Sequence, residues 1–182
     1  MKHIVVAAFL FAALAPAHAQ LVNENLLVKM PDGYKVGWND RNAQRMMSEM
    51  VPAGETVENW TEMVTVQIFF GLKSPPQVFR ARMNALWSKA CPSSTSIPIA
   101  AGPERGYPTE VWQQTCESNP QTKKPEYTYF KAIQGNDSFY VVQKAFKYEP
   151  TIDEVKKWTL YLKGVSVCDS RLADRACPAA KN

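Results

Sequence analysis

The chain has 182 residues, of which 46% are hydrophobic and 21% are charged, and its formal net charge at pH 7 is +4. This composition excludes low-complexity disorder, a collagen-like repeat and a protein with several membrane spans. An ordinary globular chain with a mild basic balance remains.

The N-terminus has the pattern of a secretory signal peptide. Lys2 and His3 precede an apolar run from Ile4 to Leu14, and Ala17-His18-Ala19 supplies small residues for cleavage. The run is about eleven residues long, whereas a bilayer core needs roughly 20. We therefore expect residues 1–19 to be removed and residues 20–182 to be a soluble, periplasmic or secreted bacterial protein without a transmembrane span. The alternative is an uncleaved first helix of a cytosolic protein, but the run has no polar face.

Cleavage after Ala19 would remove both histidines of the chain, His3 and His18. A chain without histidine has no Ser-His-Asp or Cys-His machinery, no His-ligated metal and no imidazole switch. Chemistry based on carboxylates, Lys, Tyr or Ser-Lys stays open. The sequence thus assigns no catalytic residue, no metal and no cofactor, and it favours a non-enzymatic protein.

All four cysteines, Cys91, Cys116, Cys168 and Cys177, lie in the predicted mature chain. An even number of cysteines in an oxidising compartment predicts two disulfides. Of the three possible pairings we favour Cys91–Cys116 and Cys168–Cys177, because each joins neighbours along the chain. No spacing is Cys-x-x-Cys, which argues against a thiolate metal site.

Extended segments dominate the first part of the mature chain. A turn at Pro31-Asp32-Gly33 precedes a predicted strand at 34–38, and a second strand is predicted at 46–51. The clearest strand is 62–70, where hydrophobic residues alternate. We expect one face of it to point toward the core, namely Val64, Val66, Ile68 and Phe70.

A helix is predicted to begin at Ser74 and to end at Cys91. Ser74 and Gln77 have the spacing of a capping box, and two prolines fit the first turn. Pro92 disfavours helical dihedrals at the residue before it. One apolar stripe is expected to pack, formed by Phe79, Met83, Leu86, Trp87 and Ala90.

The second part of the chain repeats this order. Short strands are predicted at 97–101 and 109–116, and residues 127–133 and 139–148 should form an antiparallel hairpin around Gly135-Asn136-Asp137. A second helix is predicted to end at Gly164, with Thr151 as its cap and Glu154 completing a capping box. Its apolar stripe is Ile152, Val155, Trp158 and Leu162.

Strands, a helix, further strands and a second helix follow one another without regular βαβ alternation, linker or repeat. This order predicts a single α+β domain over residues 20–182, in which two main helices pack against an antiparallel sheet. It is similar to the element order of the Mog1/PsbP-like group of small α+β domains. That resemblance implies a fold; because it includes no motif, it assigns no functional residue.

The best candidate for recognition is the segment from Gly102 to Pro108. Arg105 supplies a cation and Tyr107 an aromatic ring in what we expect to be a glycine-rich, mobile loop. A plain surface loop is the alternative. We expect the segment between Cys168 and Cys177 to staple the terminus.

Three hypotheses about function remain. The first is an exported cell-envelope protein that is not an enzyme and that binds or assists an envelope protein or an anionic envelope surface. Nucleic acid is not an expected partner, because the basic residues are scattered. The second is a histidine-free, carboxylate-based hydrolase, for which Glu55, Glu58 and Glu62 are candidates and solubilising charges the alternative. The third is a carrier that holds a small ligand between sheet and helices. The sequence predicts no oligomeric state.

Overall fold

The computed structural model describes residues 21–179, so the predicted signal peptide lies outside the described residues. No helix in this part of the chain has the length and hydrophobicity needed to cross a membrane. The elements are β1 Glu24–Leu27, β2 Tyr34–Arg41, β3 Arg45–Pro52, β4 Glu62–Phe70, α1 Pro76–Ala90, β5 Thr95–Glu104, β6 Tyr107–Cys116, β7 Glu126–Gln134, β8 Ser138–Phe146, α2 Ile152–Gly164, β9 Ser166–Asp169 and the short 3₁₀ helix η1 Ala173–Arg175.

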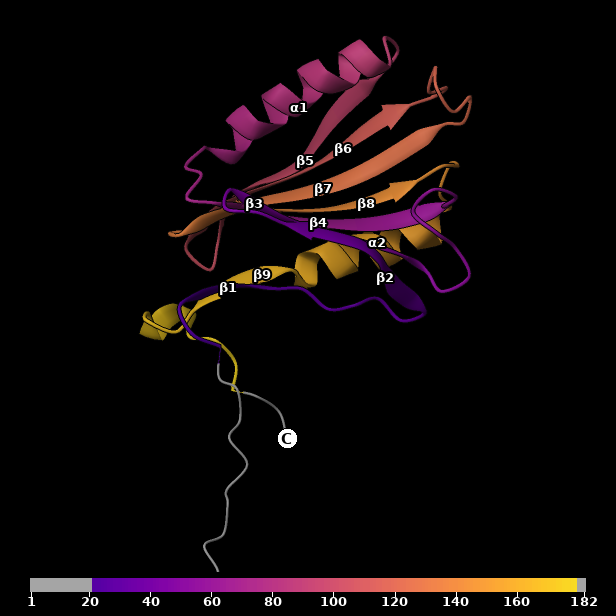
Figure 1. Cartoon of the computed structure of the whole chain (residues 1–182). Helices are drawn as coiled ribbons and strands as arrows, with labels where there is room; N and C mark the ends of the chain where they lie inside the picture. The colour runs from indigo at the N-terminus through magenta and orange to yellow at the C-terminus, as the bar shows by residue number, and fades with distance from the viewer. Residues whose placement is uncertain (1–20, 180–182) are drawn as a thin grey trace, which may run out of the picture.

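Seven strands form one antiparallel sheet in the order β2-β3-β4-β8-β7-β6-β5, and β1 pairs with β9 in a separate two-stranded sheet. The helix α1 lies on one face of the large sheet and α2 on the other (Figure 1). The α+β prediction is therefore confirmed. The β7–β8 hairpin and the capping box of α2 are also present as predicted.

The middle strands of the sheet bury side chains on both faces, whereas β2 and β5 at its edges are largely exposed. On the α2 face, Val64 and Val66 of β4 join a core that includes Trp158 and Leu162. On the α1 face, Trp112 and Phe130 stack with ring centroids 4.7 Å apart. Of the predicted core face of β4, Val64, Val66 and Ile68 pack as expected, whereas Phe70 lies outside that core. Phe69 on the opposite face packs against Phe79 of α1. Alternation within one strand does not reveal that a second helix covers the other face.

The helix α1 differs from its prediction at its start and in its inner face. Pro75 is the N-cap and no side chain caps the helix; the backbone N–H of Ser74 instead donates to Gln134 Oε1 at 2.6 Å. Leu86, at 58% exposure, and Ala90 are exposed, although both were expected to pack, whereas Asn84, expected outside the stripe, is half-buried. The contacts of α1 with the sheet, described below, set which side of the helix faces inward.

The expected mobile loop at Gly102–Gly106 is mostly strand. The strand β5 continues to Glu104 and β6 begins at Tyr107, so only two residues connect them. Both have positive φ, 48° at Arg105 and 76° at Gly106, as a two-residue type I′ hairpin turn requires. The glycine-rich composition therefore marks a tight turn rather than a long loop.

Candidate functional site

Three contacts hold α1 above β6 and β7. The N–H of Ser74 binds Gln134 at the start of the helix. In the first half of the helix, Arg80 Nε lies 2.6 Å from Oε1 of Glu110, a carboxylate whose side chain is only 2% exposed. At the end of the helix, a disulfide joins Cys91 to Cys116 on β6. The helix is thus fixed at one side of the sheet.

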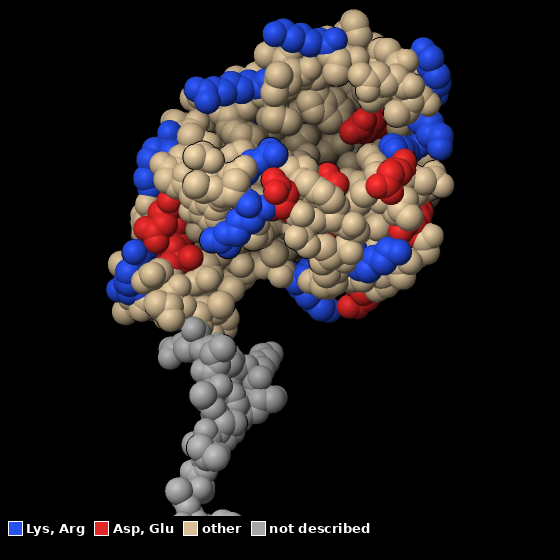
Figure 2. Space-filling model, in the orientation of Figure 1, with Lys and Arg blue, Asp and Glu red and all other residues tan. Residues whose placement is uncertain are grey.

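A hollow separates α1 from the sheet beside these contacts. Figure 2 shows it below the layer formed by α1, with acidic side chains at its rim. We call this cavity of 330 Å³ the α1 cleft, and its lining residues are Met83, Leu86, Trp87, Ala90, Cys91, Cys116, Asn119, Glu126 and Gln143. The helix supplies apolar side chains, and the sheet with its loops supplies most of the polar ones.

The polar groups of the α1 cleft can donate and accept hydrogen bonds. Asn119 Nδ2 donates to Glu126 Oε2 at 3.2 Å. Burial raises the pKa of Glu126, and this hydrogen bond and the charge of Lys147 offset only part of that effect. In the same layer, Asn84 Oδ1 and Thr128 Oγ1 are buried without a hydrogen-bond partner in the described chain. Such groups are uncommon in folded proteins and call for a partner.

A line of polar side chains continues from the cleft across the sheet. Strand pairing places Gln143 opposite Thr65, Thr65 opposite Glu49 and Glu49 opposite Trp38. We call Glu49, Thr65 and Gln143 the polar row. None of the three makes a side-chain hydrogen bond within residues 21–179, and burial raises the pKa of Glu49. Because adjacent strands lie about 4.8 Å apart, the line from Trp38 to Gln143 is about 14 Å long.

The opposite face holds its polar groups very differently. The side chain of Lys144 is completely buried, and its Nζ donates to Glu62 Oε2 at 2.6 Å and to the Tyr34 hydroxyl at 2.8 Å. The same Nζ lies 3.9 Å from the ring centroid of Trp158 on α2. Burial lowers the pKa of Lys144 to about 8, an effect that Glu62 partly opposes. These contacts bind α2 to the sheet and leave Nζ no access to a ligand.

A second buried lysine on that face has the same arrangement. Lys131 Nζ contacts Glu104 Oε2 at 2.5 Å and donates to the backbone carbonyl of Val165 at 2.8 Å. Its side chain is also fully buried. Both lysines therefore stabilise the folded structure.

The carboxylates proposed for a hydrolase are used in other ways. Glu62 binds Lys144, and Glu55 accepts from the backbone N–H of Thr61 at 2.7 Å and from its hydroxyl. Burial raises the pKa of each carboxyl, but these hydrogen bonds outweigh it, so both pKa values lie below the ordinary one. Glu58 is exposed. The carboxyls with raised pKa values are Glu49 and Glu126, which sequence reasoning did not select.

Arg105 and Tyr107 do not form a joint surface. Arg105 is exposed at the β5–β6 turn, whereas Tyr107 is only 2% exposed and its ring lies 4.6 Å from the guanidinium carbon of Arg175. As the first residue of β6, Tyr107 points toward the core on the α2 face. A buried ring cannot contact a partner, so this structure corrects the expected role of Tyr107.

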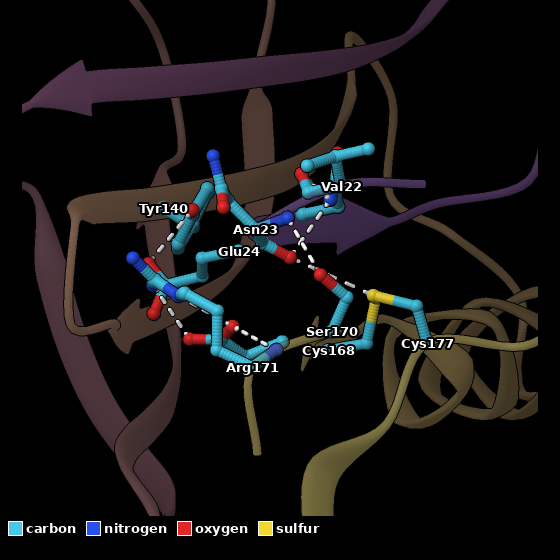
Figure 3. Close-up of a disulfide and its surroundings, with 10 residues drawn as sticks. Val22, Asn23, Glu24, Tyr140, Cys168, Ser170, Arg171 and Cys177 are labelled. Atoms are coloured by element: carbon cyan, nitrogen blue, oxygen red, sulfur yellow. Dashed lines mark hydrogen bonds and ion pairs between the residues drawn. A yellow bond between two sulfur atoms is a disulfide. The ribbon is translucent and has the colours of Figure 1, made fainter. Parts of the chain in front are cut away.

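The C-terminal loop fastens both ends of the described chain, and its disulfide joins Cys168 to Cys177 (Figure 3). Beside the disulfide, the backbone N–H of Asn23 donates to Ser170 Oγ at 2.8 Å. Glu24 accepts from the Tyr140 hydroxyl at 2.9 Å and so connects β1 to β8. Both disulfides have the pairing favoured from the sequence, and the contacts of this loop are those of a structural staple.

Comparisons with known proteins extend only to the fold. No family model and no curated protein matches the sequence. Similar solved structures include the Saccharomyces cerevisiae Ran-binding protein Mog1p, with 10% identity, a TM-score of 0.44 and coverage of 78% of this chain and 85% of that chain. They also include the cyanobacterial PsbP of Synechocystis, with 10% identity, a TM-score of 0.45 and coverage of 85% and 98%.

A further similar structure is LpqN, described as involved in cell envelope biogenesis of Mycobacterium tuberculosis. It has 10% identity, a TM-score of 0.41 and coverage of 82% of this chain and 87% of that chain. The likeness to the Mog1/PsbP-like group is thus confirmed as a likeness of fold. At these identities and TM-scores it assigns no function and no residue to this chain.

Proposed function

We propose that this chain is an exported, soluble protein of the bacterial cell envelope that acts by binding rather than by catalysis, and that the α1 cleft is its binding site. The observation that carries this proposal is the cleft itself. Its volume of 330 Å³ is within the range of small-molecule sites, and its lining combines apolar side chains of α1 with polar side chains of the sheet and its loops.

The groups in the cleft suit binding. Glu126, Asn119 and Gln143 offer one carboxyl and two amides, which can orient a ligand by hydrogen bonds. Of the three carboxyls of the hydrolase hypothesis, Glu55 and Glu62 are engaged elsewhere and have lowered pKa values, and Glu58 is exposed. The hypothesis of a small-ligand carrier is therefore the form of the binding function that the cleft favours.

Export is supported by the cysteines and by the leader. All four cysteines form disulfides, which persist in oxidising compartments and are rare in the cytosol. The signal-peptide pattern precedes the first described residue. Cell fractionation should give a periplasmic, oxidised chain that begins near Gln20. A reduced cytosolic chain that keeps its leader would contradict export.

The binding site can be tested by filling it. Both alanines are exposed, but Ala90 lines the cleft and Ala85 does not. Native mass spectrometry of the full chain purified from its own host should show a bound ligand that denaturation releases. Ala90→Trp should abolish this adduct at an unchanged melting temperature, and the matched control Ala85→Trp should keep it. An adduct that survives Ala90→Trp, or a wild-type protein without one, would overturn the proposal.

A further inference from the structure

The α1 cleft and the polar row are one continuous surface. Gln143 belongs to both, because it lines the cleft and also begins the row across β8, β4 and β3. The row ends beside Trp38 on β2, which is 39% exposed. The site is thus elongated, with the α1 cleft at one end, the nearly buried Thr65 in the middle and the exposed Trp38 at the other end.

The spacing and chemistry of the polar row suit a chain of hydroxyl-bearing units. Gln143 offers an amide, Thr65 a hydroxyl and Glu49 a carboxyl, so donors and acceptors are both present. They repeat at the strand spacing of about 4.8 Å, which is close to the length of one sugar ring. None of them makes a side-chain hydrogen bond to residues 21–179. Gln143 and Glu49 are half-buried and can reach a ligand, whereas Thr65 is only 7% exposed.

Aromatic rings stand at the two ends of this surface. Trp87 lines the cleft and Trp38 follows the polar row at the edge of the sheet. An indole offers a flat apolar face, and a sugar ring has an apolar C–H face with hydroxyls around its edge. Rings at the ends and hydrogen-bonding groups between them therefore match a short sugar chain better than a purely apolar molecule.

The charge of this surface further restricts the chemical class of the ligand. Glu49 and Glu126 are its carboxyl groups, and neither forms an ion pair with a residue in the described part of the chain. Lys147 is near enough to Glu126 to lower its pKa, but burial raises the pKa of both carboxyls. An anionic ligand would add repulsion, whereas the hydroxyl and acetamido groups of neutral sugars can donate to these oxygens.

We propose that the α1 cleft and the polar row together bind a linear oligosaccharide of neutral sugars. One ring lies against Trp87 in the cleft, and the following units lie along Gln143, Thr65 and Glu49 toward Trp38. This inference rests on the binding function proposed above and adds the class of ligand.

The test uses the full mature chain and four defined probes. The probes are maltotriose, triacetylchitotriose, the cation spermidine and the apolar amine N-phenyl-1-naphthylamine, each followed by ¹H–¹⁵N NMR. At least one trisaccharide should bind saturably and shift the indole signals of Trp38 and Trp87 and the side-chain amide of Gln143. Spermidine and the apolar amine should not.

A matched pair of variants then tests whether the trisaccharide binds along the polar row. Gln143→Leu should weaken trisaccharide binding roughly tenfold, because one hydrogen bond of the polar row is lost. The control Gln113→Leu makes the same change at a half-buried strand position on the opposite face and should leave binding unchanged. Equal effects of the two variants would overturn the placement.

The outcomes separate the sugar inference from the binding function. If neither trisaccharide binds, the sugar inference fails. If the co-purified adduct then still disappears in Ala90→Trp, the binding function stands with a ligand of another class. If no probe binds and the wild-type chain carries no adduct, both proposals fail together.

Discussion

The two faces of the sheet differ in the partners of their buried lysine, asparagine and threonine side chains. Under α2, two fully buried lysines, Lys131 and Lys144, each have a glutamate partner and a second oxygen acceptor. Under α1, Asn84 and Thr128 have buried polar atoms with no partner in the described residues. An unpaired buried polar group costs free energy, so the paired lysines stabilise the packing of α2 on the sheet. Tyr107 has an unpartnered buried hydroxyl on the α2 face as well, so the difference between the faces lies in their buried charges.

The difference follows from how each helix is fastened. The helix α2 lies on the sheet with Trp158 and Leu162 only 2% exposed. Within α1 only Pro76 is buried, because the Arg80–Glu110 pair and the Cys91–Cys116 disulfide hold the helix at one side. The helix α2 thus buries its large apolar side chains against the sheet more completely than α1 does.

The largest expected effect on the free energy of unfolding comes from removing Glu62, the carboxylate partner of buried Lys144. Glu62→Leu would leave the buried Lys144 ammonium without its carboxylate and should lower the free energy of unfolding by about 3–5 kcal/mol. Urea denaturation measures this loss. The double variant Glu62→Leu/Lys144→Met should regain most of it, because both charges are then absent. A loss below about 1 kcal/mol for Glu62→Leu would show that this pair does not fasten α2.

The next largest effect concerns the disulfides. Cys91 and Cys116 are separated by 25 positions and Cys168 and Cys177 by 9. Replacing the first pair with alanine should cost about 3.5 kcal/mol and replacing the second about 2.7 kcal/mol, by loop entropy alone. Denaturation under oxidising conditions checks both. Only loss of the first pair should also weaken ligand retention, since it frees the end of α1; equal retention would contradict the role of this disulfide in the cleft.

A smaller effect is expected from pH. The pKa of Lys144 is about 8 in the fold and 10.5 when unperturbed, so between these values the unfolded chain binds more protons. The free energy of unfolding should therefore rise with pH from about 8 to 9.5, by at most about 1.4 kcal/mol per unit. The window ends there because Tyr34 and Tyr148 have raised pKa values and act in the opposite direction near pH 10. Lys144→Met should remove the rise; a slope unchanged in that variant would assign it to other groups.

Sequence reasoning succeeded where the signal is local. The bounds of β4, the capping box at Thr151 and Glu154 and the β7–β8 hairpin depend on residues close together in the chain, and all agree with the structure. The polar row depends on the pairing of β3 with β4 and of β4 with β8, which no local pattern specifies. Likewise, composition places Tyr107 in a loop because it does not reveal the two-residue turn before β6.

The smallest expected effect on the free energy of unfolding is that of substituting Glu49 in the polar row, and it contrasts most strongly with the effect of substituting Glu62. Glu49 makes no side-chain hydrogen bond within the described part of the chain, and burial raises its pKa, so its carboxylate gains nothing from folding. Glu49→Gln keeps the shape without the charge, and at pH 7 it should change the free energy of unfolding by less than about 0.5 kcal/mol, with a slight gain in stability. Thermal denaturation in parallel with Glu62→Gln, which should be clearly destabilising, makes the comparison within one experiment. A loss above about 1 kcal/mol in the free energy of unfolding of Glu49→Gln would mean that this carboxylate has a stabilising partner in the fold. The contrast between Glu49 and Glu62 would then be wrong.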